Sequence, residues 1–394
     1  MEISWNELEQ EAILLRRTIH RYAETGGCEV KTSALIKEEA KAAGLPVITM
    51  KGTGCVVVLD TKRPGKHLAL RADMDALPIP EAAENNRTKK ACVSENPATC
   101  HACGHDAHTA MLLCVMKALV QKKEELCGAV YFCFEQGEEN RSGYAAMLDT
   151  LSRCSIDSVF GIHVAARIKS GLVGITPGAI STGVIPISVT IHGQGGHSSC
   201  PELCKNPLIP AAEFVGAAHA ALYQTLPAAS SLSMALTTIH CGSARNIIAE
   251  HALVEGCMRY TDPNEGMRAK KAVMDTARLI AAAHGCTVQF DPVMDSGYIP
   301  VKNDESCTER ARQIAAKLWG SQAVLGDVVL SGSESFGYYT DRYPGVFIQL
   351  GTGSSEKGTD AQHHNPHFDV DEDMLIRGIM LTVCYTENYL AEDE

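Results

Sequence analysis

Short apolar runs in the N-terminal part of the chain are typical of buried strands, and helical patterns lie between them. Strands are predicted at 55–59, 67–72, 128–134 and 158–162, and helices at 5–24, at 32–43 and from the end of the segment 101–108 to about Lys123. Strands that alternate with helices favour an α/β fold, in which a mostly parallel sheet carries helices on both faces.

Side chains that can bind metals or protons follow three of these strands. They are Asp73 and Asp75 after the strand at 67–72, Glu138 and Glu139 after the strand at 128–134, and His163 after the strand at 158–162. Open α/β sheets bind their ligands beyond the carboxyl ends of the strands. One Glu-Glu pair or one His in such a place is usually an ordinary surface residue, but the repetition at successive strands favours a shared site.

The segment 101–108 reads HACGHDAH and gathers three imidazoles, a thiol and a carboxylate. Cys103 and His105 are separated only by Gly104, and residues two apart in an extended or turn-like backbone can point to the same side. Glycine lacks the Cβ that would keep the two side chains apart. A helical apolar run follows, so we expect a loop at the entrance to a helix. A polar loop with a helix cap at Asp106 is the simpler alternative, but so many metal-binding groups favour a metal site.

Cys100 and Cys103 also form a C-x-x-C pair, which occurs in redox proteins and zinc ribbons. A ribbon needs a second such pair, and the sequence contains none. A redox pair stays as an alternative, although it would not explain His105 or the acidic residues at the strand ends. The 16 cysteines are scattered, several within apolar runs, which indicates buried free thiols in a reducing cytoplasm.

The middle of the chain has another pattern. Strands are predicted at 184–192, 231–241, 250–260 and 286–291, and helices at 207–225 and 264–284. The order β-α-β-β-α-β is that of a ferredoxin-like domain. Afterwards the sequence shows a helix at 304–318, an apolar run at 328–330, a strand at 346–350 and a helix at 372–391. We therefore predict a catalytic domain made of 1–180 and 295–394, with a ferredoxin-like α+β domain inserted at 181–294.

Composition narrows the class of partner. The formal net charge of −12 argues against nucleic acid. No apolar run approaches the length of a membrane span, and the N-terminus has no signal-peptide pattern. We therefore expect a cytoplasmic globular protein that binds neither nucleic acid nor membrane.

Several motifs resemble the aminoacylase/carboxypeptidase G superfamily of metallopeptidases, and most closely its amidohydrolase branch of hippurate hydrolases and indole-acetyl-amino-acid hydrolases. The most specific motifs are LRADMDALP at 70–78 and HACGHDAHTAM at 101–111. Looser matches lie at 138–139, 160–163, 195–197, 246–248, 333–336 and 364–366. The resemblance therefore covers nearly the whole chain.

The resemblance implies a role for each candidate residue. A pair of divalent metals would be held by Cys103, His105, Glu139, His163 and His364. Glu138 would be the catalytic base, Asp75 would support a ligand histidine, and the inserted domain would contact the substrate through His197, Asn246 and Arg259. Imidazole, carboxylate and thiolate ligands fit zinc or manganese, and also cobalt or nickel. The resemblance also implies that 181–294 acts as a lid and builds a homodimer.

The chain departs from the family pattern in a few places. Arg141 stands in the segment after the Glu-Glu pair, which is often rich in glycine in the family, and could narrow or redirect the substrate pocket. Ser335 replaces the usual aspartate of a Ser-Glu-Asp-Phe motif. His363 stands beside His364, and the Asn-Pro that follows favours His364 as the ligand. Cys100 is a thiol without an assigned role.

The expected reaction is metal-dependent hydrolysis of the amide bond of an N-acyl amino acid, which releases a carboxylic acid and an amino acid. A dipeptidase or an aminobenzoyl-glutamate hydrolase is the alternative within the hydrolases. A non-catalytic metal-binding or thiol redox protein is the alternative from another class, and the residues that would carry it are Cys100 and Cys103.

Overall fold

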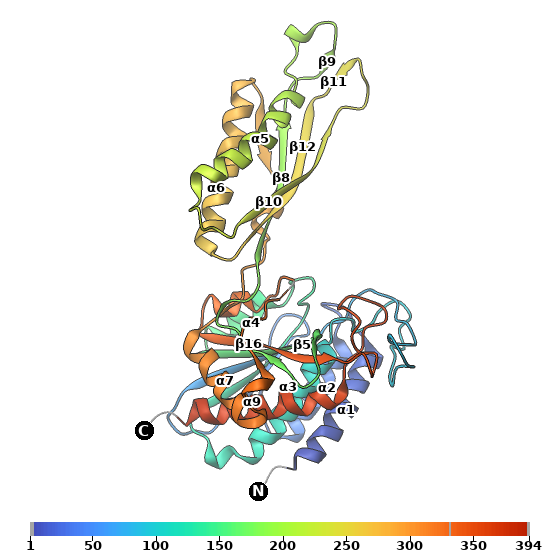
Figure 1. Ribbon diagram of the computed structural model, residues 1–394, viewed down its shortest axis with the longest axis vertical. Helices are drawn as coiled ribbons and strands as arrows, with labels where there is room; N and C mark the ends of the chain where they lie inside the picture. Colours follow the sequence, from blue (N-terminus) through green and yellow to red (C-terminus); the bar gives the residue numbers. More distant parts are fainter. Residues whose placement is uncertain (1–3, 331, 392–394) are drawn as a thin grey trace. The chain divides into compact units, whose positions relative to one another are not determined.

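The computed structural model describes residues 4–330 and 332–391, in which the chain forms two units (Figure 1). The first unit comprises the residues up to Ile180, Lys302–Val329 and those from Tyr338 onward. The second comprises Ser181–Val301 and Leu330–Gly337. The second unit thus runs past the predicted end at 294, and it also takes in a short segment from the later part of the chain.

The first unit is built on an eight-stranded sheet with the order β1-β2-β4-β3-β5-β16-β6-β15. Its strands are β1 (Val47–Thr49), β2 (Cys55–Asp60), β3 (His67–Asp73), β4 (Ala129–Glu135), β5 (Ser158–Lys169), β6 (Val173–Gly174), β15 (Val324–Leu325) and β16 (Gly345–Gly353). The four central strands β4, β3, β5 and β16 are parallel to one another, and antiparallel pairs lie toward the edges. A separate pair joins β7 (Gly178–Ala179) to β14 (Lys302–Asn303). The predicted mostly parallel α/β sheet is confirmed.

Helices complete this unit, and α3 is the most deeply buried of them. The helices are α1 (Trp5–Tyr22), α2 (Val30–Ala42), α3 (His105–Gln121), α4 (Tyr144–Leu151), α7 (Glu305–Trp319), α8 (Gly337–Thr340) and α9 (Leu375–Leu390). Side chains of α1, α3 and α9 form one core with alternate residues of the central strands. Residues on the other face of these strands are buried as well, which explains why the strands appear in the sequence as unbroken apolar runs.

The second unit has a four-stranded antiparallel sheet with the order β10-β12-β8-β13. Its elements are β8 (Gly183–His192), β9 (Gly196–His197), α5 (Leu208–Thr225), β10 (Ser233–Cys241), β11 (Ile247–Ile248), β12 (His251–Tyr260), α6 (Pro263–Ala283) and β13 (Thr287–Phe290). Helices α5 and α6 pack together and share a core with the sheet. Leaving aside the short β9–β11 pair, the order β8-α5-β10-β12-α6-β13 is the predicted β-α-β-β-α-β pattern.

Some elements differ from their prediction. β5 continues to Lys169, because β16 pairs with it beyond the apolar run that ends at Ile162. The segment 193–199, between the predicted strand at 184–192 and the predicted helix at 207–225, contains the two-residue strand β9. The apolar run at 328–330 belongs to neither a helix nor a strand. Within the described ranges 4–330 and 332–391, no helix is both long enough and apolar enough to cross a membrane.

Candidate metal centre

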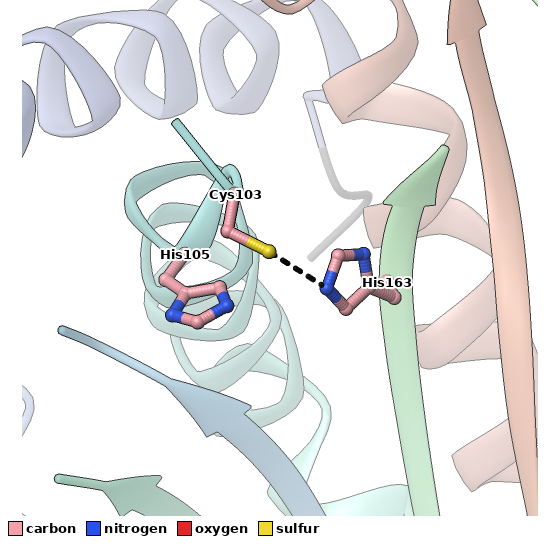
Figure 2. A group of neighbouring side chains, drawn as sticks. All are labelled: Cys103, His105 and His163. Atoms are coloured by element: carbon pink, nitrogen blue, oxygen red, sulfur yellow. Dashed lines mark hydrogen bonds between the residues drawn. The ribbon is translucent and has the colours of Figure 1, made fainter. Parts of the chain in front are cut away.

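The polar residues that follow the central strands lie together at the carboxyl ends of these strands. β4, β3 and β5 are adjacent and parallel, so their carboxyl ends point the same way. Asp75 and Glu138 follow β3 and β4, whereas His163 lies inside β5 because that strand is longer than predicted. The loop before α3 reaches the same end of the sheet, where Cys103 Sγ lies 3.6 Å from His163 Nε2 (Figure 2).

Gly104 allows Cys103 and His105 to face the same point. It has φ +90°, which is a left-handed conformation, and it forms the N-cap of α3. A Cβ at this position would lie 2.4 Å from Val164 Cγ2, which is too close for any other residue. The glycine is therefore required by both the backbone conformation and the approach of β5.

Asp106 does not cap α3, so the simpler reading of this segment is wrong. The carboxylate is fully buried and accepts hydrogen bonds from Arg16 Nε at 3.1 Å and His20 Nδ1 at 2.7 Å. The charges of Arg16 and His20 outweigh the effect of burial and hold the pKa of Asp106 far below its usual value. This buried group ties the start of α3 to α1.

The five expected ligands come together in overlapping groups. Ligand atoms lie within 4.8 Å of one another in the groups Cys103–His105–His163, Cys103–Glu139–His364 and His105–Glu138–Glu139. Figure 2 shows the side chains of the first group converging from the α3 loop and β5. A further such group is Asp73–His105–His108. The structure therefore gathers imidazole, carboxylate and thiol donors into one small volume.

His105 is held in one tautomer. Its Nδ1 lies 3.1 Å from Asp75 Oδ1, so Nδ1 donates to the carboxylate, and in the neutral ring Nε2 carries the lone pair. Nε2 is buried and makes no hydrogen bond with any residue that the structure describes. A buried nitrogen lone pair that points into a group of metal-binding side chains is what a ligand histidine requires.

Asp75 also orders the Glu-Glu turn. Its two carboxylate oxygens accept hydrogen bonds from Glu138 N and Glu139 N, each at 3.1 Å. The same carboxylate therefore fixes the His105 ring and the backbone of both glutamates. Glu138 is buried, and Glu139 Oε1 lies 3.2 Å from His364 Nε2.

His363 and His364 have different surroundings. His363 Nε2 accepts a hydrogen bond from Ala166 N at 3.3 Å, whereas His364 Nε2 faces Glu139. His364 has φ +62°, which few non-glycine residues adopt, and its N donates to Ala102 O at 2.8 Å. The left-handed turn thus places His364 beside Cys103 and Glu139.

The three residues expected to contact substrate lie in the second unit. His197 and Asn246 are close together, because Ser198 N donates to Asn246 O at 3.1 Å and β9 pairs with β11. Arg259 is near the opposite end of β12, where its Nη1 donates to Thr182 Oγ1 at 3.4 Å. All three side chains are exposed.

Sequence reasoning missed two groups that hold the site in place. His108 lies between Asp73 and β5, with its Nδ1 2.6 Å from Asp73 Oδ1. Glu29 is fully buried and accepts a hydrogen bond from Gly137 N at 2.8 Å, just before the Glu-Glu pair. The third histidine of HACGHDAH was a signal for the first group, but nothing near Glu29 in the sequence pointed to the second.

Cys100 and Cys103 are both free thiols. Burial raises the pKa of Cys103 well above its usual value. A thiolate at this position therefore needs a nearby cation to be stable at neutral pH, and a metal ion supplies one. Cys100 is also buried, and burial raises the pKa of its thiol to about 11. Neither thiol has the low pKa of a reactive redox cysteine.

Comparison with known proteins gives consistent matches over the whole chain. Thermostable carboxypeptidase 1 of Saccharolobus solfataricus is 32% identical over 95% of this chain and 94% of its own length. The N-acetylcysteine deacetylase of Bacillus subtilis is 30% identical over 92% of each chain. The YXEP protein of Bacillus subtilis, described as a dinuclear metal-binding peptidase, has a fold that superposes with a TM-score of 0.82 at 24% identity, over 98% of this chain and all of that one.

The model of peptidase family M20/M25/M40 matches residues 69–388, a range that includes the ligand group and the whole second unit. Together with the curated relatives, this match confirms the resemblance drawn from the sequence motifs. The chain therefore belongs to peptidase family M20/M25/M40, and it is a hydrolase.

Proposed function

We propose that the protein hydrolyses the amide bond of N-acyl amino acids and releases a carboxylic acid and an amino acid. The observation that carries this proposal is the convergence of five metal-binding side chains beside the buried carboxylate of Glu138. The name of the relative that deacetylates N-acetylcysteine supports the class of substrate.

The residues present fit a pair of divalent cations. The donors are those of Cys103, His105, Glu139, His163 and His364. The buried Nε2 of His105 lacks a partner among the described residues, and the buried Cys103 thiol requires a cation to ionise. When bound, two such cations would polarise the scissile carbonyl and make a water molecule more acidic. Zinc or manganese suits this donor set, and cobalt or nickel is an alternative.

Glu138 is the proposed general base. Its backbone is fixed by Asp75, so its side chain is held next to the ligand group while Glu139 faces His364. The carboxylate would accept a proton from the attacking water and later pass it to the nitrogen of the leaving amine. Asp75 would act indirectly, because it orients His105 and both glutamates without touching the substrate.

The second unit would supply substrate contacts and the oxyanion donor. His197 Nδ1 accepts a hydrogen bond from Ser199 N at 3.2 Å, so the neutral ring carries its proton on Nε2. Nε2–H is then a donor for the oxygen of the tetrahedral intermediate. Asn246 lies beside His197 and would bind substrate with it, and Arg259 would bind substrate from its own position on β12. In this proposal 181–294 acts as a lid and as the contact of a homodimer, in a cytoplasmic enzyme.

The second candidate function is hydrolysis of short peptides. The match to a carboxypeptidase favours it, since a C-terminal peptide bond is also an amide bond to an amino acid. Aminobenzoyl-glutamate is the remaining substrate type within this class. All three share the same reacting group and differ only in the acyl portion.

A substrate screen tests the proposal. Purified protein would be supplied with Mn²⁺ or Zn²⁺ and offered N-acetyl, N-benzoyl and indole-acetyl amino acids, dipeptides and aminobenzoyl-glutamate, each with a matched chelator control. The proposal expects the highest kcat/KM for an N-acyl amino acid, with loss of turnover in chelator. Turnover of dipeptides alone would favour the second candidate, and no metal-dependent hydrolysis of any amide would contradict both.

A further inference from the structure

The strand that carries His163 loses one neighbour just before this residue. β3 pairs with β5 only as far as Arg71 and Gly161, whereas β5 continues to Lys169. The backbone of Val164 therefore lies beyond the last pairing with β3. On the side of β5 that faced β3, an amide hydrogen needs another partner, because a buried N–H without a hydrogen bond is destabilising.

His108 supplies that partner. Val164 N donates to His108 Nε2 at 2.9 Å. An amide N–H can only donate, so Nε2 is unprotonated and the hydrogen of the neutral ring is on Nδ1. That Nδ1–H points to Asp73 Oδ1 at 2.6 Å. One neutral imidazole thus links the last residue of β3 to the part of β5 that no longer pairs with β3.

Asp73, the carboxylate to which His108 donates, is itself held by further hydrogen bonds. Asp73 Oδ2 accepts a hydrogen bond from Arg71 Nη1 at 2.6 Å, and Thr109 Oγ1 donates to Asp73 O at 2.8 Å. Burial opposes ionisation of Asp73, but this ion pair with the buried Arg71 guanidinium stabilises the carboxylate.

The segment that His108 supports sets the orientation of His163. His163 Nδ1 donates to Val164 O at 2.7 Å, which leaves Nε2 to face Cys103. The rings of His108 and His163 also meet edge to face, with centroids 4.5 Å apart and planes at 67°. The same imidazole therefore fixes the backbone next to His163 and limits the rotation of its ring.

We propose that His108 is a positioning residue, which replaces the missing strand partner of β5 and so pre-orients His163 for a metal ion. This inference rests on the proposed metal centre. It predicts that the bond from His108 to Val164, rather than the bond to Asp73, governs the affinity of the ion that His163 binds. Groups that orient a metal ligand typically contribute about 10- to 100-fold in metal affinity.

Two substitutions separate the bonds. The amide oxygen of glutamine can take the place of Nε2, so His108→Gln retains an acceptor for Val164 N. Asparagine is shorter and places its amide near the position of Nδ1, so His108→Asn retains only a partner for Asp73. His101→Asn is the matched control, because His101 is equally buried in the same segment and its ring nitrogens bond to no residue that the structure describes.

The measurement is Zn²⁺ binding to metal-free protein, in competition with a chromophoric chelator, with thermal unfolding of each metal-free variant alongside. We expect two binding steps for the unmodified protein, a loss of about 10-fold or more in one step for His108→Asn, and less than about threefold for His108→Gln and His101→Asn. Equal losses in both His108 variants, unchanged affinity in His108→Asn, or the same loss in His101→Asn would overturn the inference. Failure of the unmodified protein to bind Zn²⁺ would instead contradict the proposed function.

Discussion

Asp75→Asn is the substitution with the effect most directly read from the structure. The Asp75 carboxylate accepts three hydrogen bonds, from His105 Nδ1 and Glu138 N on Oδ1 and from Glu139 N on Oδ2. An asparagine has one acceptor oxygen and one NH₂ group, so in either orientation at least one of these donors faces another donor. The side chain is buried, and water cannot take over the lost bond.

The size of the effect follows from that mismatch. One unsatisfied buried donor costs about 1–3 kcal/mol, and each 1.36 kcal/mol changes a rate tenfold. We therefore expect kcat/KM for an N-acyl amino acid to fall by about 5- to 150-fold in Asp75→Asn, measured at a metal concentration that saturates the unmodified protein. The matched control is Asp60→Asn, since Asp60 is a carboxylate at the end of β2 whose side chain, among the residues that the structure describes, bonds to Lys62 alone. An unchanged kcat/KM in Asp75→Asn, or an equal loss in Asp60→Asn, would refute the role given to Asp75.

Three further results are expected. Glu138→Gln should retain the bound metal but reduce kcat by about two to four orders of magnitude, since it removes only the proton acceptor; loss of metal with unchanged activity per metal would make Glu138 a ligand. His197→Ala should keep its metal and lose about 100-fold in kcat; recovery of activity after verified subunit exchange with Glu138→Gln would show that His197 acts across a dimer, and no recovery would leave it serving its own chain. Burial opposes protonation of His20, but Asp106 and Glu81 raise its pKa from 6.5 to about 9. Protonated His20 should therefore add on the order of 3 kcal/mol to the free energy of unfolding. This contribution should be complete below pH 6.5 and be lost as the pH rises through 9. The difference in free energy of unfolding between the unmodified protein and His20→Gln measures it, and a difference independent of pH would contradict it.

The position of the site at the carboxyl ends of the central strands was predictable, because the strand pattern and the metal-binding residues pointed to the same place. Unbroken apolar runs indicated parallel buried strands, and parallel neighbours bring Asp75 and Glu138 to one edge. A role for Gly104 was also expected, from the absence of a Cβ between Cys103 and His105, but its left-handed conformation and the close approach of Val164 were not.

Other parts of the site depend on tertiary structure that local patterns do not contain. The role of His108 arises because β3 stops pairing before β5 ends, and strand lengths in a sheet depend on all neighbours. The left-handed conformation of His364 is unusual for a residue other than glycine. The proximity of His197 and Asn246 comes from two-residue strands, which are too short to leave a periodic signal.

The central claim is that Cys103, His105, Glu139, His163 and His364 hold two divalent ions on which amide hydrolysis depends. The most direct test measures metal per chain by elemental analysis together with hydrolysis of an N-acyl amino acid, before chelation, after chelation and after return of Mn²⁺ or Zn²⁺. We predict two ions per chain, loss of activity when they are removed, and recovery when they are returned. Full activity in chelator, with no metal found by elemental analysis, would contradict the claim.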